Sequence, residues 1–146
     1  MWKTFLSGLL GLSLLSACSN DVANTGGTGG APVVAPAGKS FLVFFDWDKS
    51  TLTYRARRII REAAATSKTT QHTKIEVNGY ADTSGKAEYN KGISMRRAQR
   101  VAAELVRNGV AKGEIAIKAF GDTVLLVPTG PGVREPQNRR VEIIIR

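Results

Sequence analysis

One aspartate and one arginine, each on an element able to hold it in place, are the residues of this chain best suited to chemistry. Residues 75–80 alternate apolar and polar side chains, the period of a half-buried strand. Apolar side chains then recur at helical spacing over 98–105. Asp82 lies just past the strand and Arg97 lies in the helix. If both face one cleft, they suit a zwitterionic ligand, because a carboxylate takes an ammonium group and a guanidinium takes a carboxylate through two hydrogen bonds.

The phase of the helix separates Arg97 from its other arginines. At roughly 100° per residue, Arg96, Arg100 and Arg107 project about 150–170° away from the centre of the apolar stripe, toward solvent. Arg97 lies only about 90° from that centre, so packing can hold its stem while the guanidinium reaches the cleft. The residue types and spacing leave one alternative open, an intramolecular salt bridge between Asp82 and Arg97.

The residues around this pair resemble a known domain family. The stretch in question is Ala81-Asp82-x-x-Gly85-x-x-x-Tyr89-Asn90-x-x-Ile93-Ser94-x-x-Arg97-Ala98, followed by Val101 and Leu105. It is similar to the core motif of OmpA-like peptidoglycan-binding domains, with Ala81 in place of the usual Thr and Ile93 in place of the usual Leu. The resemblance continues in residues 45–48 and 138–142 and covers about residues 41–146.

The resemblance assigns a role to the predicted pair. In the family, the residues that match Asp82 and Arg97 hold the amino and carboxylate groups of meso-diaminopimelate in the peptidoglycan stem peptide. The resemblance therefore implies a non-catalytic wall-binding domain without a cofactor. The other residues expected at the cleft are Trp47, Asp48, Thr83, Asn90, Ile93 and Arg139. Two alternatives stay open, a plain turn role for Asp48 and a strand-end role in solubility for Arg139.

The resemblance also implies partners and a location. Lipid-anchored members of the family link the outer membrane to the wall, with roles in envelope integrity and cell division. Their partners are the peptidoglycan stem peptide, a periplasmic propeller protein of the Tol system and the inner-membrane Tol proteins. The alternative function is an envelope assembly lipoprotein that acts mainly through protein partners, with wall binding secondary.

The N-terminal segment has the layout of a secretory signal. A short positive start precedes an apolar run over 5–15, which is too short for a stable membrane span. Leu15-Ser16-Ala17-Cys18 resembles the bacterial lipobox, which implies cleavage before Cys18 and lipidation of its thiol. Bacterial lipoproteins that stay in the inner membrane usually carry Asp directly after the lipidated cysteine. Here Ser19 follows Cys18, so the resemblance implies transport to the outer membrane, with the domain facing the periplasm. The alternative is an ordinary signal peptide with a spare thiol.

The predicted boundaries are 1–17 for the signal, 18–40 for a lipidated, flexible Gly/Pro/Thr tether, and 41–146 for the domain.

Composition argues against other functional classes. The net charge is +9, from 21 Lys and Arg against 12 Asp and Glu, but the chain has neither zinc-ligand spacing nor an RNA-recognition signature, so we expect no nucleic acid partner. Four arginines at 55, 57, 58 and 61 are expected to form a solvated helix face.

His72 is the sole histidine and stands in a polar stretch without a nucleophile pattern, so we expect no catalysis. Asp46 and Asp48 lack further carboxylates at ligand spacing, so we expect no metal.

The order of expected elements is βαβαββ. The predicted strands are 41–45, 75–80, 115–119 and 139–145, and the predicted helices start at a Ser50 or Thr51 cap and after residue 85. This order indicates an α+β, OmpA C-terminal-like two-layer sandwich with two main helices on one face of a mixed sheet. Residues 122–137 form a long loop with three prolines, which either borders a site or only connects strands.

Overall fold

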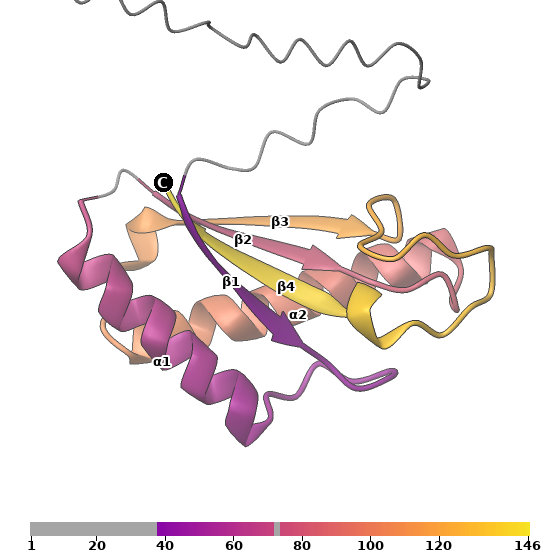
Figure 1. The fold of residues 1–146 in the computed structure, drawn as a ribbon, viewed down its shortest axis with the longest axis horizontal. Coiled ribbons are helices and arrows are strands. Elements are labelled where there is room, and N and C mark those ends of the chain that lie inside the picture. The colour runs from indigo at the N-terminus through magenta and orange to yellow at the C-terminus, as the bar shows by residue number, and fades with distance from the viewer. Residues whose placement is uncertain (1–37, 72–73) are drawn as a thin grey trace, which may run out of the picture. The chain divides into compact units, whose positions relative to one another are not determined.

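The computed structural model describes residues 38–71 and 74–146 (Figure 1). The main elements in chain order are β1 (Lys39–Phe44), α1 (Tyr54–Thr69), β2 (Ile75–Tyr80), α2 (Ala87–Arg107), β3 (Ile115–Gly121) and β4 (Arg140–Ile145). Short 3-10 helices occur at Lys112–Glu114 and Pro136–Asn138. The predictions for the signal, Cys18, nearly all of the tether and His72 lie outside the described residues.

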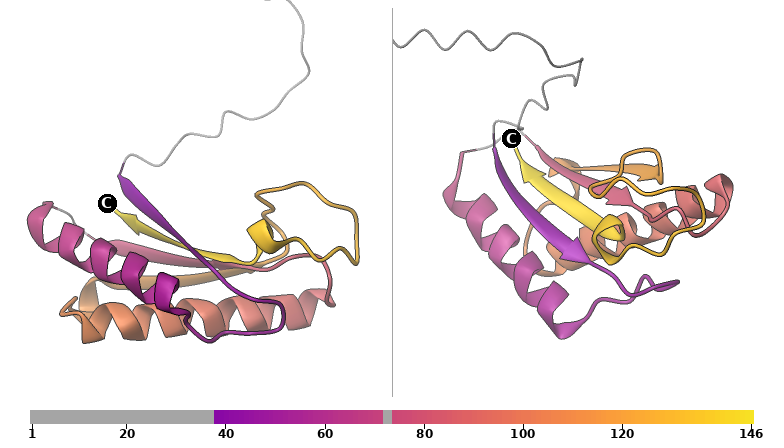
Figure 2. Two further views of the ribbon diagram at one scale, coloured as in Figure 1. Left: turned by 60° about the horizontal axis from the view of Figure 1, so that its bottom comes forward. Right: turned by 45° about the vertical axis from the view of Figure 1, so that its right-hand side comes forward.

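The four strands form one mixed sheet with the order β1-β4-β2-β3. β2 and β3 are parallel and are joined through α2, whereas β4 lies antiparallel to both β1 and β2. α1 packs on β1, and α2 packs on β2 and β3. Both helices lie on the same side of the sheet (Figure 2), which confirms the predicted α+β fold.

The core fills the space between the sheet and the helices. Ile143 and Val77 point from the two central strands toward Ile60 of α1 and Leu105 of α2, and all four are fully buried. Each such side chain contributes roughly 1.5–3 kcal/mol when it is removed from water. These contacts hold α2 rigidly against the sheet, which is what fixes the position of Arg97.

The predicted start of α1 was wrong. The helix begins at Tyr54, and the hydroxyl of Thr53, not of Ser50 or Thr51, accepts the capping hydrogen bond from the backbone of Ala56. Leu52 consequently precedes the helix, although it still packs against the core. Residues 49–53 instead form an irregular connection, in which the backbone carbonyl of Lys49 accepts a hydrogen bond from Arg97 of α2.

The prediction that β2 is half-buried was also wrong, since all six of its residues are buried. Glu76 and Asn78 point away from the helices, yet they are only 5% and 6% exposed. β2 is a central strand, so side chains from both neighbouring strands cover its second face. Lys118 and Arg146 lie 3.8 and 3.2 Å from the Glu76 carboxylate, and Lys74 lies 2.9 Å away.

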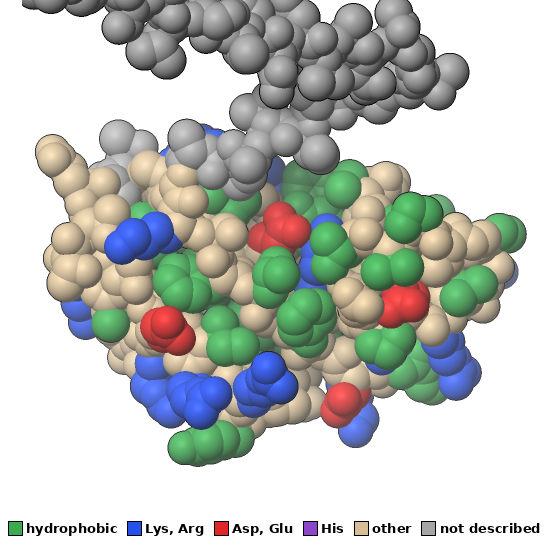
Figure 3. Space-filling model, in the orientation of Figure 1, with side chains coloured by type: hydrophobic (Ala, Val, Ile, Leu, Met, Phe, Trp, Pro, Cys, Tyr) green, Lys and Arg blue, Asp and Glu red, His purple; other side chains and the backbone are tan. Residues whose placement is uncertain are grey.

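The face of the sheet turned away from the helices carries apolar as well as charged side chains (Figure 3). Leu42 and Phe44 of the edge strand β1 are exposed there. Along α1, the four arginines of the predicted basic face are all exposed, and Arg57 alone of them has an ion-pair partner among the described residues, the Glu104 carboxylate at 3.7 Å. No helix within 38–71 or 74–146 has both the length and the apolar character required to cross a membrane.

Candidate ligand-binding site

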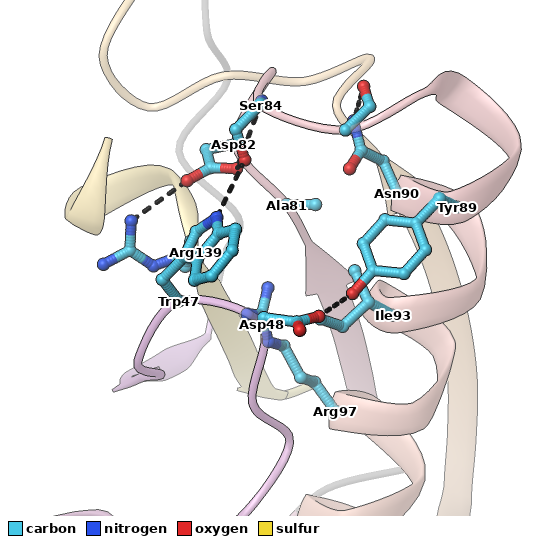
Figure 4. Close-up of a pocket in the computed structure, with 11 residues that line it drawn as sticks. Trp47, Asp48, Ala81, Asp82, Ser84, Tyr89, Asn90, Ile93, Arg97 and Arg139 are labelled. Carbon is cyan, nitrogen blue, oxygen red and sulfur yellow. Dashed lines mark hydrogen bonds and ion pairs between the residues drawn. The ribbon is translucent and has the colours of Figure 1, made fainter. Parts of the chain in front are cut away.

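A cleft opens beyond the end of β2, between the β1–α1 connection and the first turns of α2 (Figure 4). Its cavity volume is about 250 Å³, which is slightly below the range of roughly 300–1,000 Å³ for small-molecule sites. The residues that line it are Trp47, Asp48, Ala81, Asp82, Ser84, Gly85, Tyr89, Asn90, Ile93, Arg97 and Arg139. Every predicted site residue of the domain except Thr83 is therefore brought to one cleft.

Asp82 is held as a buried carboxylate. It is 3% exposed, and one of its oxygens accepts hydrogen bonds from the hydroxyl and the backbone N–H of Ser84, at 2.6 and 3.3 Å. The other oxygen accepts from Arg139 at 3.0 Å and from the Glu135 backbone N–H at 3.2 Å. Burial opposes ionisation, but the hydrogen bonds from Ser84 and Arg139 outweigh it and hold the pKa of Asp82 below its usual value of 3.8.

Arg97 is buried without a carboxylate partner among the described residues. It is 1% exposed, and its three hydrogen bonds go to the backbone carbonyls of Lys49, Asp46 and Tyr80, at 2.9, 3.1 and 3.4 Å. Burial, with repulsion from Arg139 second, lowers the pKa of Arg97 to about 10. The guanidinium is therefore still charged at neutral pH, and an anion in the cleft would relieve the cost of burying it.

The alternative of an intramolecular salt bridge between Asp82 and Arg97 is not what the structure shows, because Arg139 is the arginine that pairs with Asp82. Arg139 is 9% exposed and also donates from Nε to the Phe45 carbonyl at 3.1 Å. The alternative of a strand-end residue that only improves solubility was therefore wrong. In Figure 4 the Arg139 and Arg97 side chains come from opposite sides of the cleft.

The rim of the cleft is built by the β1–α1 connection and by α2. The Trp47 indole donates to the Ser84 hydroxyl at 3.3 Å, and the Tyr89 hydroxyl donates to the Asp48 carboxylate. Asp48 has a φ of +54°, in the left-handed region that side chains rarely adopt. This contact with Tyr89 gives Asp48 more than a turn role, since it joins the two walls of the cleft.

Asn90 fixes the turn that carries Asp82. Its Nδ2 donates to the Gly85 carbonyl at 2.9 Å and to the Asp122 carboxylate at 3.0 Å. A Cβ on Gly85 would lie 2.6 Å from Asn90 Oδ1, so a larger residue there would push the Asn90 side chain out of its present place. Asn90 and Ile93 thus line the cleft, where the family resemblance implied them, and they are 2% and 4% exposed.

Thr83 does not line the cleft but anchors the long loop that follows β3. Its hydroxyl lies 2.7 Å from the Gly130 carbonyl and accepts from the Val133 N–H at 3.1 Å. The fully buried Asn138 holds the same loop, because its Oδ1 accepts from the N–H groups of Leu126 and Val127 at 2.8 and 2.9 Å. The loop therefore borders the site.

Sequence reasoning missed three contributions to the site. These are the Ser84 hydroxyl on Asp82, the Glu135 N–H on Asp82, and the anchoring of the loop by Asn138. A long loop with several prolines was the available signal for the last two, but it did not show which backbone groups would face the cleft. No group of three or more His, Cys, Asp or Glu side chains within the described residues is arranged to hold a metal ion.

Comparisons with known proteins agree with this architecture. The profile of the OmpA family matches residues 44–139. An "Outer membrane protein" of Gluconacetobacter diazotrophicus is 57% identical over 113 residues, which cover 73% of this chain but only 30% of that protein. The "Peptidoglycan-associated lipoprotein" of Haemophilus influenzae is 32% identical over 117 residues, which cover 76% of each chain.

A solved structure shows the same fold. The crystal structure of the peptidoglycan-associated lipoprotein from Burkholderia pseudomallei superposes with a TM-score of 0.66 at 23% identity, covering 73% of this chain and 90% of that one. The family match spans most of the chain and includes both Asp82 and Arg97 as well as Arg139. This chain belongs to the OmpA family.

Proposed function

We propose that this protein binds peptidoglycan without catalysis, through the meso-diaminopimelate of the stem peptide. One observation carries the proposal: the cleft holds a buried, ionised Asp82 and a buried Arg97 that has no carboxylate partner among the described residues. Diaminopimelate carries an ammonium and a carboxylate on the same distal carbon. Such a zwitterion matches both groups at once.

Arg97 has the free capacity that a carboxylate needs. A guanidinium has five N–H donors, and three of those of Arg97 are used by backbone carbonyls. The two that remain are available to the ligand carboxylate. On the other side, Asp82 accepts four hydrogen bonds, of which those from the N–H groups of Ser84 and Glu135 are long, at 3.3 and 3.2 Å. An ammonium group can displace these weaker contacts.

The proposal extends to the location. If Cys18 is lipidated, two or more acyl chains give stable membrane anchoring where one is marginal. The tether of 18–40 then lets the domain reach the wall, so that the protein links the outer membrane to peptidoglycan. A role with the periplasmic propeller protein of the Tol system and the inner-membrane Tol proteins, in envelope integrity and cell division, is part of the same proposal. Intact-mass analysis of the mature protein tests the anchor, since acyl chains are expected on Cys18 and are lost in Cys18→Ser.

Sedimentation with purified sacculi tests the binding proposal. The protein should pellet with sacculi whose stem peptides contain diaminopimelate, and free diaminopimelate peptides should release it. Peptides with lysine at that position are the matched control, because lysine keeps the ammonium but lacks the carboxylate for Arg97. Equal binding to lysine-type and diaminopimelate-type walls would contradict the proposal. Failure to bind either wall, with envelope proteins still captured, would favour the assembly lipoprotein instead.

A further inference from the structure

A third arginine, Arg134, stands at the rim of the cleft, in addition to Arg97 and Arg139, which line it. The guanidinium carbon of Arg134 lies 3.7 Å from the centre of the Trp47 ring, so the two planar groups are in stacking contact. Trp47 itself lines the cleft and is 45% exposed. Arg134 belongs to the long loop after β3, and it lies outside the cavity that holds Asp82 and Arg97.

The position of Arg134 is set by the same residues that build the site. The N–H of Val133 donates to the Thr83 hydroxyl at 3.1 Å, and the N–H of Glu135 donates to Asp82 at 3.2 Å. Both chain neighbours of Arg134 are thus tied to the turn that presents Asp82. The loop therefore holds Arg134 at a fixed place beside the cleft.

The guanidinium of Arg134 remains available for an anion. The side chain is exposed, and within the described residues it has neither an ion pair nor a side-chain hydrogen bond. Stacking on Trp47 occupies one face of the guanidinium, which leaves the N–H donors at its edge free to bind. A stacked arginine is also more restricted than a free one, so it loses less conformational entropy when it binds a carboxylate.

The charges at the cleft point to a ligand with an additional negative group. Asp48 and Asp82 give −2 in the lining and Arg97 and Arg139 give +2, so the lining sums to zero and suits a zwitterion. Arg134 adds a cation at the rim, whereas the carboxylate of the neighbouring Glu135 accepts a hydrogen bond from the Gln137 N–H at 3.0 Å. The cavity of about 250 Å³ is small, so a peptide bound in it has to continue over the rim.

We propose that Arg134, stacked on Trp47, forms a second subsite that binds a further carboxylate of the peptide held in the cleft. This inference rests on the proposed function, because it takes the cleft to hold diaminopimelate. The carboxylate comes either from the free α-carboxylate of the preceding γ-linked glutamate or from the C-terminus of the stem peptide. Arg134 then makes the site selective for walls in which that carboxylate is not amidated.

Calorimetric titration of the full chain with three soluble stem peptides tests the proposal. One peptide has both carboxylates free, one has the glutamate α-carboxylate amidated, and one has the C-terminus amidated. We expect the wild type to bind one of the amidated peptides about tenfold more weakly than the free acid, and that peptide identifies the source of the carboxylate. Arg134→Gln should bind the free acid about tenfold more weakly and should show no preference between the acid and that amide. Arg134→Lys should recover only part of the preference.

Arg58→Gln is the matched control, because it removes the same charge from an exposed position on α1 and should leave all three affinities unchanged. Equal affinity of the wild type for all three peptides, or an equal loss in Arg134→Gln for acid and amides, would overturn the Arg134 subsite and leave the diaminopimelate site standing. Absence of wild-type binding to every peptide would overturn both proposals.

Discussion

Arg139 Nη1 lies 3.0 Å from Asp82 Oδ2, and this buried ion pair joins the start of β4 to the end of β2. Arg139 also donates a hydrogen bond from Nε to the backbone carbonyl of Phe45, just past the end of β1. One side chain therefore ties three neighbouring strands together at the edge of the cleft. The carboxylate proposed to bind the ligand is fixed before any ligand arrives, so binding does not have to order it.

Loss of Arg139 should destabilise the fold. Arg139→Ala leaves the Asp82 carboxylate buried without its cation, and removal of one partner of a buried pair costs about 3–5 kcal/mol. Thermal melts should show a midpoint lower by more than about 12 °C. Lys49→Ala is the control, because its ion pair with Asp46 is long, at 3.9 Å, and both side chains are exposed, so a change of at most about 1 kcal/mol is expected. Equal melting temperatures for Arg139→Ala and wild type would show that the pair adds nothing to stability.

Arg97 should be required for wall binding as a guanidinium and not merely as a cation. Arg97→Ala should weaken sacculus binding by about 2–5 kcal/mol, or roughly 30- to several-thousand-fold. Arg97→Lys should fail substantially as well, because an ammonium group cannot make the paired hydrogen bonds to a carboxylate. Asp82→Ala should lose binding to a similar degree.

Arg96→Ala supplies the control for this series, since Arg96 is the exposed neighbour on the same helix. It should bind sacculi like wild type. Melting curves on the same variants separate a loss of binding from a loss of folding. Folded Arg97→Ala protein that still pellets with sacculi as the wild type does would refute the site.

Glu76 should make the stability depend on pH in the acid range. The hydrogen-bonded ion pair with Lys74 lowers the pKa of Glu76 below its usual 4.5, against the opposing effect of burial. The unfolded state then binds more protons than the folded state, so this contribution is fully present above about pH 4.5 and is lost as the pH falls through the folded-state pKa. Urea unfolding between about pH 7 and pH 3 should show this loss in wild type and less of it in Glu76→Gln. Glu62→Gln, an exposed change on α1, should retain the wild-type pH dependence.

Gly79 should not tolerate a larger residue. A Cβ at this position of β2 would lie 2.1 Å from the Ser94 carbonyl oxygen of α2, so the helix would have to move away from the sheet. Overpacking of this kind costs typically 1–3 kcal/mol, and here it would also displace Arg97 on the same helix. Gly79→Ala should therefore lose both stability and affinity for sacculi. Gly113→Ala, where a Cβ meets no atom within 4 Å, is the control and should fold and bind normally.

The sequence by itself determined the local features of this protein. The strand that ends near Asp82 and the helix that carries Arg97 follow from hydrophobic periods of two and 3.6 residues. The placement of Arg97 on the buried flank of α2 follows from helical phase, as does the exposure of Arg96. These features depend on neighbouring residues alone, so the spacing of side chains along the chain is enough to predict them.

Only the tertiary structure decided which charges meet. Asp82 pairs with Arg139, which is 57 positions away in the chain, and not with Arg97 on the adjoining helix. The insertion of β4 beside β2 brings Arg139 to that place and also buries the second face of β2. The hydrogen bonds of Arg97 to the carbonyls of Asp46 and Lys49 likewise join residues that are 51 and 48 positions apart in the chain. Such contacts arise from the order of strands in the sheet, and no local period in the sequence encodes that order.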